Sequence, residues 1–210
     1  MKKTILILYF ALTTLLCFGQ KEHLAPAKDF KQYGGVLKEY YDNVFSKLYE
    51  GFSQTPYARF TSIPSFSIEY AFSVEAIDNK YYIISNSFSE NFWYAISRNN
   101  VKLVSEKTEI NNDLYIKIGE LFQILAGQIK KLENEIIGFD GVTYYFSTTD
   151  TSGQIVTGET WSPNDATLLG KLIKVCDKLF YINNQENVIK IDIANEIEVL
   201  IEELKNQNAQ

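Results

Sequence analysis

Apolar residues recur every three or four positions in four stretches of the chain, which predicts four amphipathic helices with one face on a core. These stretches lie at residues 29–50, 111–132, 163–183 and 188–205. Gly51 ends the first stretch, and Asn111 provides a capping residue for the second. Gly34 and Gly35 interrupt the first stretch, which indicates either a close crossing with another element or a later helix start.

Residues 57–105 alternate between apolar and polar positions, as is typical of β-strands with one covered face. The predicted strands lie at residues 66–77, 80–88, 91–97 and 101–105, and residues 106–109 are expected to form a polar loop. Asp78 and Asn79 form a two-residue turn signal between the first two strands. Connections this short imply an antiparallel sheet.

A β-hairpin that leads into a helix is predicted for residues 139–165. Two segments rich in β-branched and aromatic residues flank a run of turn formers in which Gly153 can adopt a positive φ. Ser162, Pro163 and Asp165 then match the N-cap, the first helical position and the capping box. We therefore expect the third helix to begin at Pro163 and Ser162 to be a structural cap rather than a nucleophile.

The order of these elements predicts one α+β domain, with an antiparallel sheet of about five to six strands and helices packed mainly on one face. Residues 133–139 extend the second helix or form a short strand, and the apolar spacing favours the helix. The predicted core contains Phe66, Ile68 and Phe72 from the long strand, Ile118, Leu121 and Leu125 from the second helix, and Leu172, Cys176 and Leu179 from the third.

Residues 1–19 have the features of a secretory signal peptide, with Lys2 and Lys3 before an apolar run and small residues at the expected cleavage site. We expect cleavage before Gln20, which leaves residues 20–210 as a single domain in the periplasm or outside the cell. The apolar run is shorter than the roughly 20 residues that span a membrane. We therefore expect no membrane span after cleavage, and favour this interpretation over an uncleaved anchor or a lipoprotein acylated at Cys17.

The charge balance argues against two classes of partner. The chain has 20 basic and 26 acidic residues, and the excess of acid grows when Lys2 and Lys3 are removed. Nucleic acids and anionic membrane surfaces both require basic patches. We therefore expect no nucleic-acid partner.

No pattern for catalysis or for metal and cofactor binding is present. The single histidine, His23, lies in the polar lead of the mature chain, and a site for zinc cannot be built from it and Cys176. Cys176 lies on an apolar helical stripe, which is typical of a buried hydrophobe. A glycosidase-type pair remains open only if two carboxylates converge in space. The carboxylates on or beside predicted strands are Glu69, Glu75, Glu90, Asp140, Asp150 and Glu159.

Aromatic residues are the one residue class that is abundant in this chain and has a functional interpretation. Consecutive pairs such as Tyr81 with Tyr82 and Trp93 with Tyr94 place one ring on each face of a strand. One ring of each pair should pack on the helices, and the other is available to a sugar, a peptide or a partner protein unless loops or a helix cover it. The candidate ligand- or partner-binding residues are Tyr82, Trp93, Tyr94, Glu159 and Trp161.

The run DGVTYYF at residues 140–146, followed by a turn, a glycine and ETWSP at residues 159–163, resembles a pattern in small exported bacterial proteins of unknown function. The resemblance implies a secreted or periplasmic α+β domain and transfers no catalytic residue. We therefore predict an exported, non-catalytic binding or protein-interaction module of unknown ligand. The alternatives are a carboxylate-dependent hydrolase and a structural or accessory subunit of an envelope complex.

Overall fold

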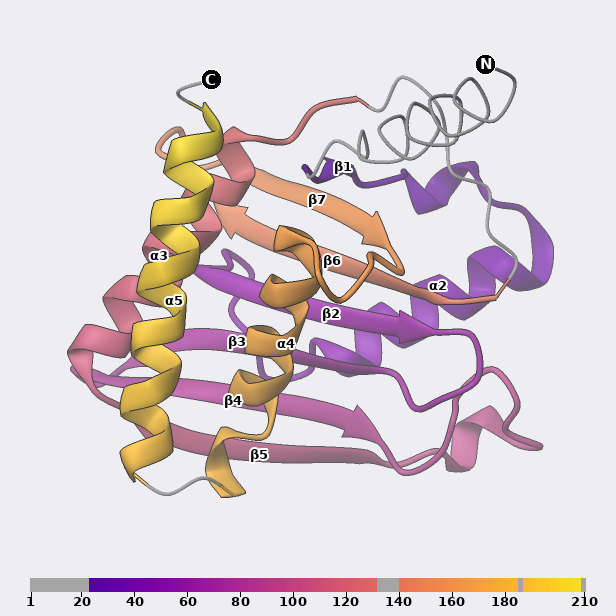
Figure 1. Ribbon diagram of the computed structural model, residues 1–210. Coiled ribbons are helices and arrows are strands. Elements are labelled where there is room, and N and C mark those ends of the chain that lie inside the picture. The colour runs from indigo at the N-terminus through magenta and orange to yellow at the C-terminus, as the bar shows by residue number, and fades with distance from the viewer. Residues whose placement is uncertain (1–22, 132–139, 185–186, 209–210) are drawn as a thin grey trace, which may run out of the picture.

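The computed structural model describes residues 23–131, 140–184 and 187–208 of the chain. Their centre is an antiparallel sheet of seven strands in the order β1-β7-β6-β2-β3-β4-β5 (Figure 1). The strands are β1 (Ala25–Pro26), β2 (Ala58–Pro64), β3 (Tyr70–Ile77), β4 (Lys80–Phe88), β5 (Leu103–Ile110), β6 (Val142–Thr149) and β7 (Ile155–Trp161). The predicted α+β fold is confirmed, and the strand count is slightly higher than expected.

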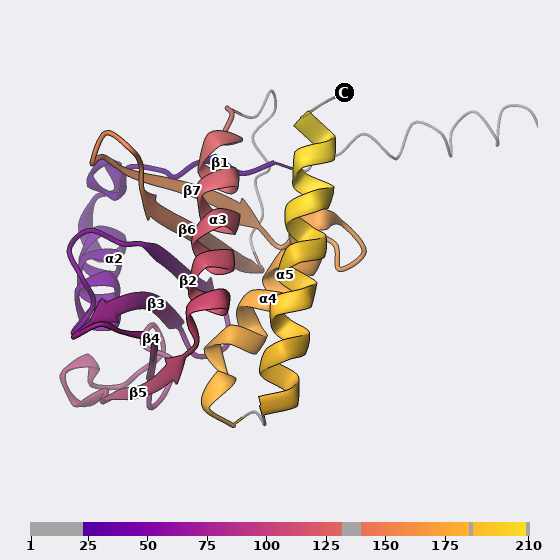
Figure 2. The same cartoon turned by 90° about the vertical axis from the view of Figure 1, so that its left-hand side faces the viewer.

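In the described part of the chain there are four helices, and more of them lie on one side of the sheet than on the other. They are α2 (Gly35–Leu48), α3 (Asn112–Gly127), α4 (Leu168–Phe180) and α5 (Asn187–Asn208). The 3-10 turns are η1 (Phe30–Gln32) before α2, η2 (Arg98–Asn100) between β4 and β5, and η3 (Ile182–Asn184) between α4 and α5. Helices α3 and α4 pack on one face of the sheet, and α5 packs on both of them as an outer layer (Figure 2). Helix α2 covers the opposite face, so the helices lie mainly on one face as predicted.

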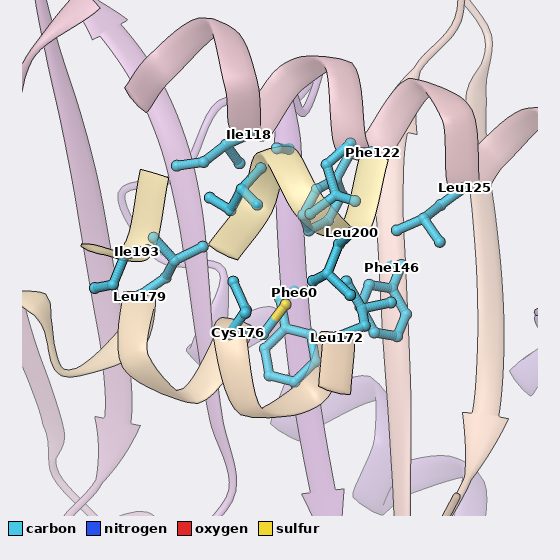
Figure 3. Packing of buried hydrophobic residues seen from close by; sticks show 14 of the residues in the cluster. Phe60, Ile118, Phe122, Leu125, Phe146, Leu172, Cys176, Leu179, Ile193 and Leu200 are labelled. Atoms are coloured by element: carbon cyan, nitrogen blue, oxygen red, sulfur yellow. The ribbon is translucent and has the colours of Figure 1, made fainter. Parts of the chain in front are cut away.

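The main core lies between the sheet and α3, α4 and α5 (Figure 3). It contains the strand residues Phe60, Phe72, Val74, Ile83 and Phe146 and the helical residues Ile118, Leu121, Leu125, Leu172, Cys176 and Leu179. The six helical core residues predicted from periodicity are therefore buried. Phe72 is buried as well, but its predicted partners Phe66 and Ile68 are not.

The prediction of a twelve-residue strand at 66–77 is wrong at its beginning. Strand β2 ends at Pro64, and β3 begins only at Tyr70, so residues 65–69 form a loop. Phe66 and Ile68 lie on this loop with 67% and 40% of their surface exposed. Their alternation with polar residues continues the pattern of the strand, but no neighbouring strand pairs with them.

Two predictions between β4 and β5 are also wrong. Residues 91–97 form turns within a loop instead of a strand, and residues 106–109 belong to β5 instead of a loop. Strand β5 is at the edge of the sheet, where most of its side chains are exposed and charged residues are tolerated. Pairing with β4, which is a long-range contact, determines its conformation.

The predicted helix start is confirmed for α3 and wrong for α4, and α2 begins later than the apolar stripe that starts at residue 29. Asn111 Oδ1 accepts the N–H of Leu114 at 2.8 Å, which confirms the predicted cap of α3. Gly35 has a φ of 57° at the first position of α2, so the later start explains the two glycines. Helix α4, however, begins at Leu168, where the Thr167 side chain accepts the N–H of Gly170 at 3.1 Å.

Ser162 therefore does not cap a helix, and the predicted start at Pro163 is wrong. Its N–H donates to Val142 O at 2.9 Å, and its Oγ accepts the N–H of Val142 at 2.8 Å. These contacts continue the β6–β7 pairing by one residue, and Ser162 adopts a φ of 36° as the chain turns away. Because its Oγ is used in this way, it is not available to α4.

Two predictions concern residues outside the described part of the chain. They are the signal peptide at residues 1–19 and the choice between helix and strand at residues 133–139. In the part that is described, none of the helices has the length and apolar character needed to cross a membrane.

Candidate functional site

Apolar side chains are exposed together on two loops at one end of the sheet, the right-hand end in Figure 1. The β2–β3 loop contributes Phe66 and Ile68, and the β4–β5 loop contributes Trp93 (37% exposed), Tyr94 (58%) and the fully exposed Ile96. The rings of Phe66 and Tyr94 are nearly parallel, with centroids 6.2 Å apart, so the two loops meet. We refer to these five residues as the aromatic rim.

Glu69, which is completely buried at the end of the β2–β3 loop, connects both loops to α2. Its Oε1 accepts the hydroxyl of Tyr40 on α2 at 2.7 Å, and its Oε2 accepts the N–H of Phe92 at 2.9 Å. Burial and the neighbouring Glu69 raise the pKa of Tyr40, so its hydroxyl remains a donor. Glu69 therefore fixes the position of the segment that carries Trp93 and Tyr94.

Further polar contacts within the loops fix the rim side chains. Asn91 donates through Nδ2 to Ser67 O on the other loop, and its Oδ1 accepts the N–H of Tyr94 at 3.0 Å. Trp93 packs edge-on against Tyr40, with ring centroids 4.9 Å apart. The rim is therefore ordered by contacts that lie beneath it and between its loops.

The structure brings together only two of the five candidate residues, Trp93 and Tyr94. Tyr82 lies on β4 towards the opposite end of the sheet, with Lys107 Nζ 3.9 Å from its ring centroid. Glu159 and Trp161 lie on β7, which is separated from β4 by three strands. Glu159 Oε2 accepts the N–H of Lys28 at 3.0 Å and so fixes the position of the segment that follows β1.

Sequence reasoning missed Phe66, Ile68 and Ile96 as exposed residues. For the first two the available signal was Pro64, because a proline ends the pairing of a strand and marks the start of a loop. Ile96 lies in the strand predicted at residues 91–97, two residues after Tyr94 and therefore on the same face. This spacing was the available signal that Ile96 belongs with Tyr94.

A second polar cluster lies under the C-terminal end of α2. The guanidinium of Arg59 is 4.3 Å from the Tyr49 ring centroid and donates to Ser53 O. Glu75 Oε1 accepts the N–H of Ser53 at 3.0 Å and the Ser73 hydroxyl at 2.6 Å. Desolvation lowers the pKa of Arg59. Because Arg59 and Glu75 are both buried, this cluster holds the chain between α2 and β2 rather than presenting a charged surface.

The other chemically notable groups are used by the fold. Asp150 Oδ1 accepts the Ser152 hydroxyl and the N–H groups of Ser152 and Gln154 in the β6–β7 turn, and these hydrogen bonds lower the pKa of its carboxyl. Cys176 is completely buried, and burial raises the pKa of its thiol. Across residues 23–131, 140–184 and 187–208, no group of three or more His, Cys, Asp or Glu side chains is placed to hold a metal ion.

Comparison with known proteins gives no match: no family model, curated protein or solved structure is similar to this chain. Its function is therefore inferred from the arrangement of its own residues.

Proposed function

We propose that this protein is a non-catalytic binding module, acting in the periplasm or outside the cell, that recognises an apolar segment of another protein through the aromatic rim. The supporting observation is the joint exposure of Phe66, Ile68, Trp93, Tyr94 and Ile96 on two adjoining loops. Contiguous apolar patches on soluble proteins mark interaction sites, and aromatic residues carry much of the binding energy at such sites.

The polar groups at the rim favour a protein segment over a glycan. Sugar recognition requires hydrogen-bonding groups next to the aromatic rings that stack on the sugar. The side chains of Asn91 and Glu69 are already engaged with Ser67, Tyr94, Tyr40 and Phe92 within the loops. The Arg98 guanidinium lies over the Trp93 ring, 5.3 Å from its centroid, and donates to Trp93 O. The aliphatic side chains of Ile68 and Ile96 match an apolar protein surface better than a hydroxylated one.

The rim is also suited to binding because its loops are fixed before a partner arrives. Ordering a loop on binding costs conformational free energy, so a pre-ordered surface retains more of the energy of its contacts. Glu69 and Asn91 provide this order, as described above. We therefore expect affinity to depend on Glu69 although it does not reach the surface.

Selection of peptides from a displayed random library on the purified protein tests the proposal. Selected peptides should be rich in apolar residues, and the double variant Phe66→Ser with Ile96→Ser should weaken their binding about tenfold or more. Val199→Ser is a matched control, because Val199 is an exposed apolar residue like Phe66 (58% against 67%) but lies on the outer helix α5. Equal affinity of the rim variant and the wild type, or an equal loss in the control, would refute the proposal.

A further inference from the structure

The two edges of the sheet differ in structure. The edge at β7 is covered by β1, and the next residue, Ala27, donates its N–H to Thr157 O at 3.0 Å. At the other edge, β5 is the last strand among the described residues. It pairs with β4 without interruption from Leu103 to Ile110, and it contains no proline or glycine.

The register shows which backbone groups of β5 point outwards. Ser89 N–H donates to Lys102 O at 2.9 Å, so these two residues form a hydrogen-bonded pair. Such pairs alternate along an antiparallel ladder, which directs the groups of Val104 and every second residue after it towards β4. The N–H and C=O groups that point away from the sheet therefore belong to Leu103, Ser105, Lys107 and Glu109.

This outer edge of β5 begins next to the aromatic rim. The loop that carries Trp93, Tyr94 and Ile96 leads directly into β5 through η2. On the side of the helices, η3 lies beside β5, and the lower ends of α4 and α5 project past it (Figures 1 and 2). These helices would obstruct a second folded sheet at this edge, whereas a single extended strand needs only the space next to β5.

We propose that the segment recognised by the rim is extended and adds to β5 as an eighth strand of the sheet. This inference rests on the proposed function of the rim. In strand addition, hydrogen bonds to the partner's main chain supply affinity, and pockets for its side chains supply specificity. Here the outward groups of Ser105 and Lys107 bond the partner's backbone, and the rim receives its apolar side chains.

A proline at Ser105 tests the added strand. Because the backbone groups of Ser105 point away from β4, Ser105→Pro removes an outward donor without removing a hydrogen bond of the sheet. It should weaken binding of a rim-selected peptide about tenfold. Ser105→Ala keeps the donor and should bind as the wild type does. Far-UV circular dichroism verifies that both variants are folded.

Amide hydrogen exchange of the wild type, followed by NMR, gives a second test that needs no substitution. The bound peptide should slow exchange at Ser105, Lys107 and Glu109, the N–H groups that point outwards. If the rim variant loses the peptide but Ser105→Pro retains it and no outward amide is protected, the proposal of an added strand is refuted and the proposed function of the rim is supported. If only Ser105→Pro loses the peptide, strand addition to β5 is supported and the proposed function of the rim is refuted.

Discussion

The two faces of the sheet differ in chemistry although they share the same strands. On the face under α3 and α4, inward residues such as the cross-strand partners Phe60 and Phe72 are apolar and fully buried. On the face under α2, buried polar residues such as Arg59, Ser73 and Asn86 lie next to a second apolar cluster. The strand residues of this cluster are Ile63, Ala71, Ile84, Phe88 and Tyr145. In the described part of the chain, α2 and a set of loops cover this second face, whereas α3 and α4 cover the first and α5 packs on them from outside.

This difference indicates a division of roles. Burial of apolar area is non-directional and stabilises the fold, whereas hydrogen bonds fix geometry. Asn86 Nδ2 donates to Leu48 O and Glu50 O, which holds the end of α2. The second face also carries a cost, because Arg59 Nε and Asn86 Oδ1 are buried without a hydrogen-bond partner in the described part of the chain. We infer that the face under α2 positions the rim and the other face supplies most of the stability.

The largest effect is expected from Leu121→Ala on α3. Leu121 is completely buried in the apolar core, so its truncation should lower the free energy of unfolding by about 2–5 kcal/mol. Urea denaturation measures this loss. Ile116→Ala, at a position half exposed on the same helix, should change stability by only about 0.5 kcal/mol. Similar losses in the two variants would show that α3 does not pack in the core and that the two faces do not differ as described.

Glu69→Ala is expected to have a smaller effect on stability and a larger one on binding. The substitution leaves the hydroxyl of Tyr40 and the N–H of Phe92 without their acceptor, at a cost of about 1–3 kcal/mol for each group. Part of this cost is offset because the buried carboxylate is itself removed. It also releases the loop that carries Trp93. Binding of rim-selected peptides should fall at temperatures where the variant is fully folded.

Leu121→Ala is the control for this prediction, because it destabilises the opposite face without touching the rim. Below its own melting temperature it should bind the peptides with wild-type affinity. If Glu69→Ala binds equally well, Glu69 does not position the rim. Glu69→Gln, which retains one acceptor oxygen, should lie between the wild type and Glu69→Ala in both measurements.

Much of the fold was predictable because helical periodicity reports burial directly. Ile118, Leu121 and Leu125 can share one face only if that face packs on something, and all three are buried. Alternation is a weaker signal. Phe66 and Ile68 continue the alternation of β3 into a loop, and Pro64 is the local signal that the neighbouring strand has ended.

Edge strands and sites depend on contacts that are distant in sequence. Glu106 and Lys107 lie in β5 because β4 pairs with them, although their charged side chains are more typical of a loop. For the candidate site, Trp93 and Tyr94 were predictable from composition. Glu69 was predictable only as one of several carboxylates, since its role depends on Tyr40 and Phe92, which come from other elements.

Thr167→Ala tests a directional contact on the side of the sheet that α3 and α4 cover. Thr167 caps α4, so its loss should cost about 1 kcal/mol, and Thr167→Ser should restore most of it. Ser162→Ala removes one hydrogen bond at an exposed position and should cost about 0.5 kcal/mol or less. Thermal melts of the three variants measure these effects. A larger loss for Ser162→Ala would support the sequence-based prediction that Ser162 caps a helix starting at Pro163.

The smallest effect concerns Asp177, the charged exception on the apolar side. It lies on α4 and accepts the hydroxyl of Tyr70, and burial raises the pKa of its carboxyl. The folded state therefore holds this proton more tightly than the unfolded state does. That contribution to stability is complete below the usual pKa of an aspartate and is lost as the pH rises through the raised value.

Asp177→Asn carries no charge at any pH and should remove this dependence while leaving an acceptor for Tyr70. Relative to the wild type, it should become more stable as the pH rises from acidic to neutral, by less than the effect of Thr167→Ala. Urea denaturation of both proteins across that range measures the difference. A constant difference at every pH would mean that Asp177 is hydrated in the folded state, and that the face under α4 is less apolar at this position than its packing indicates.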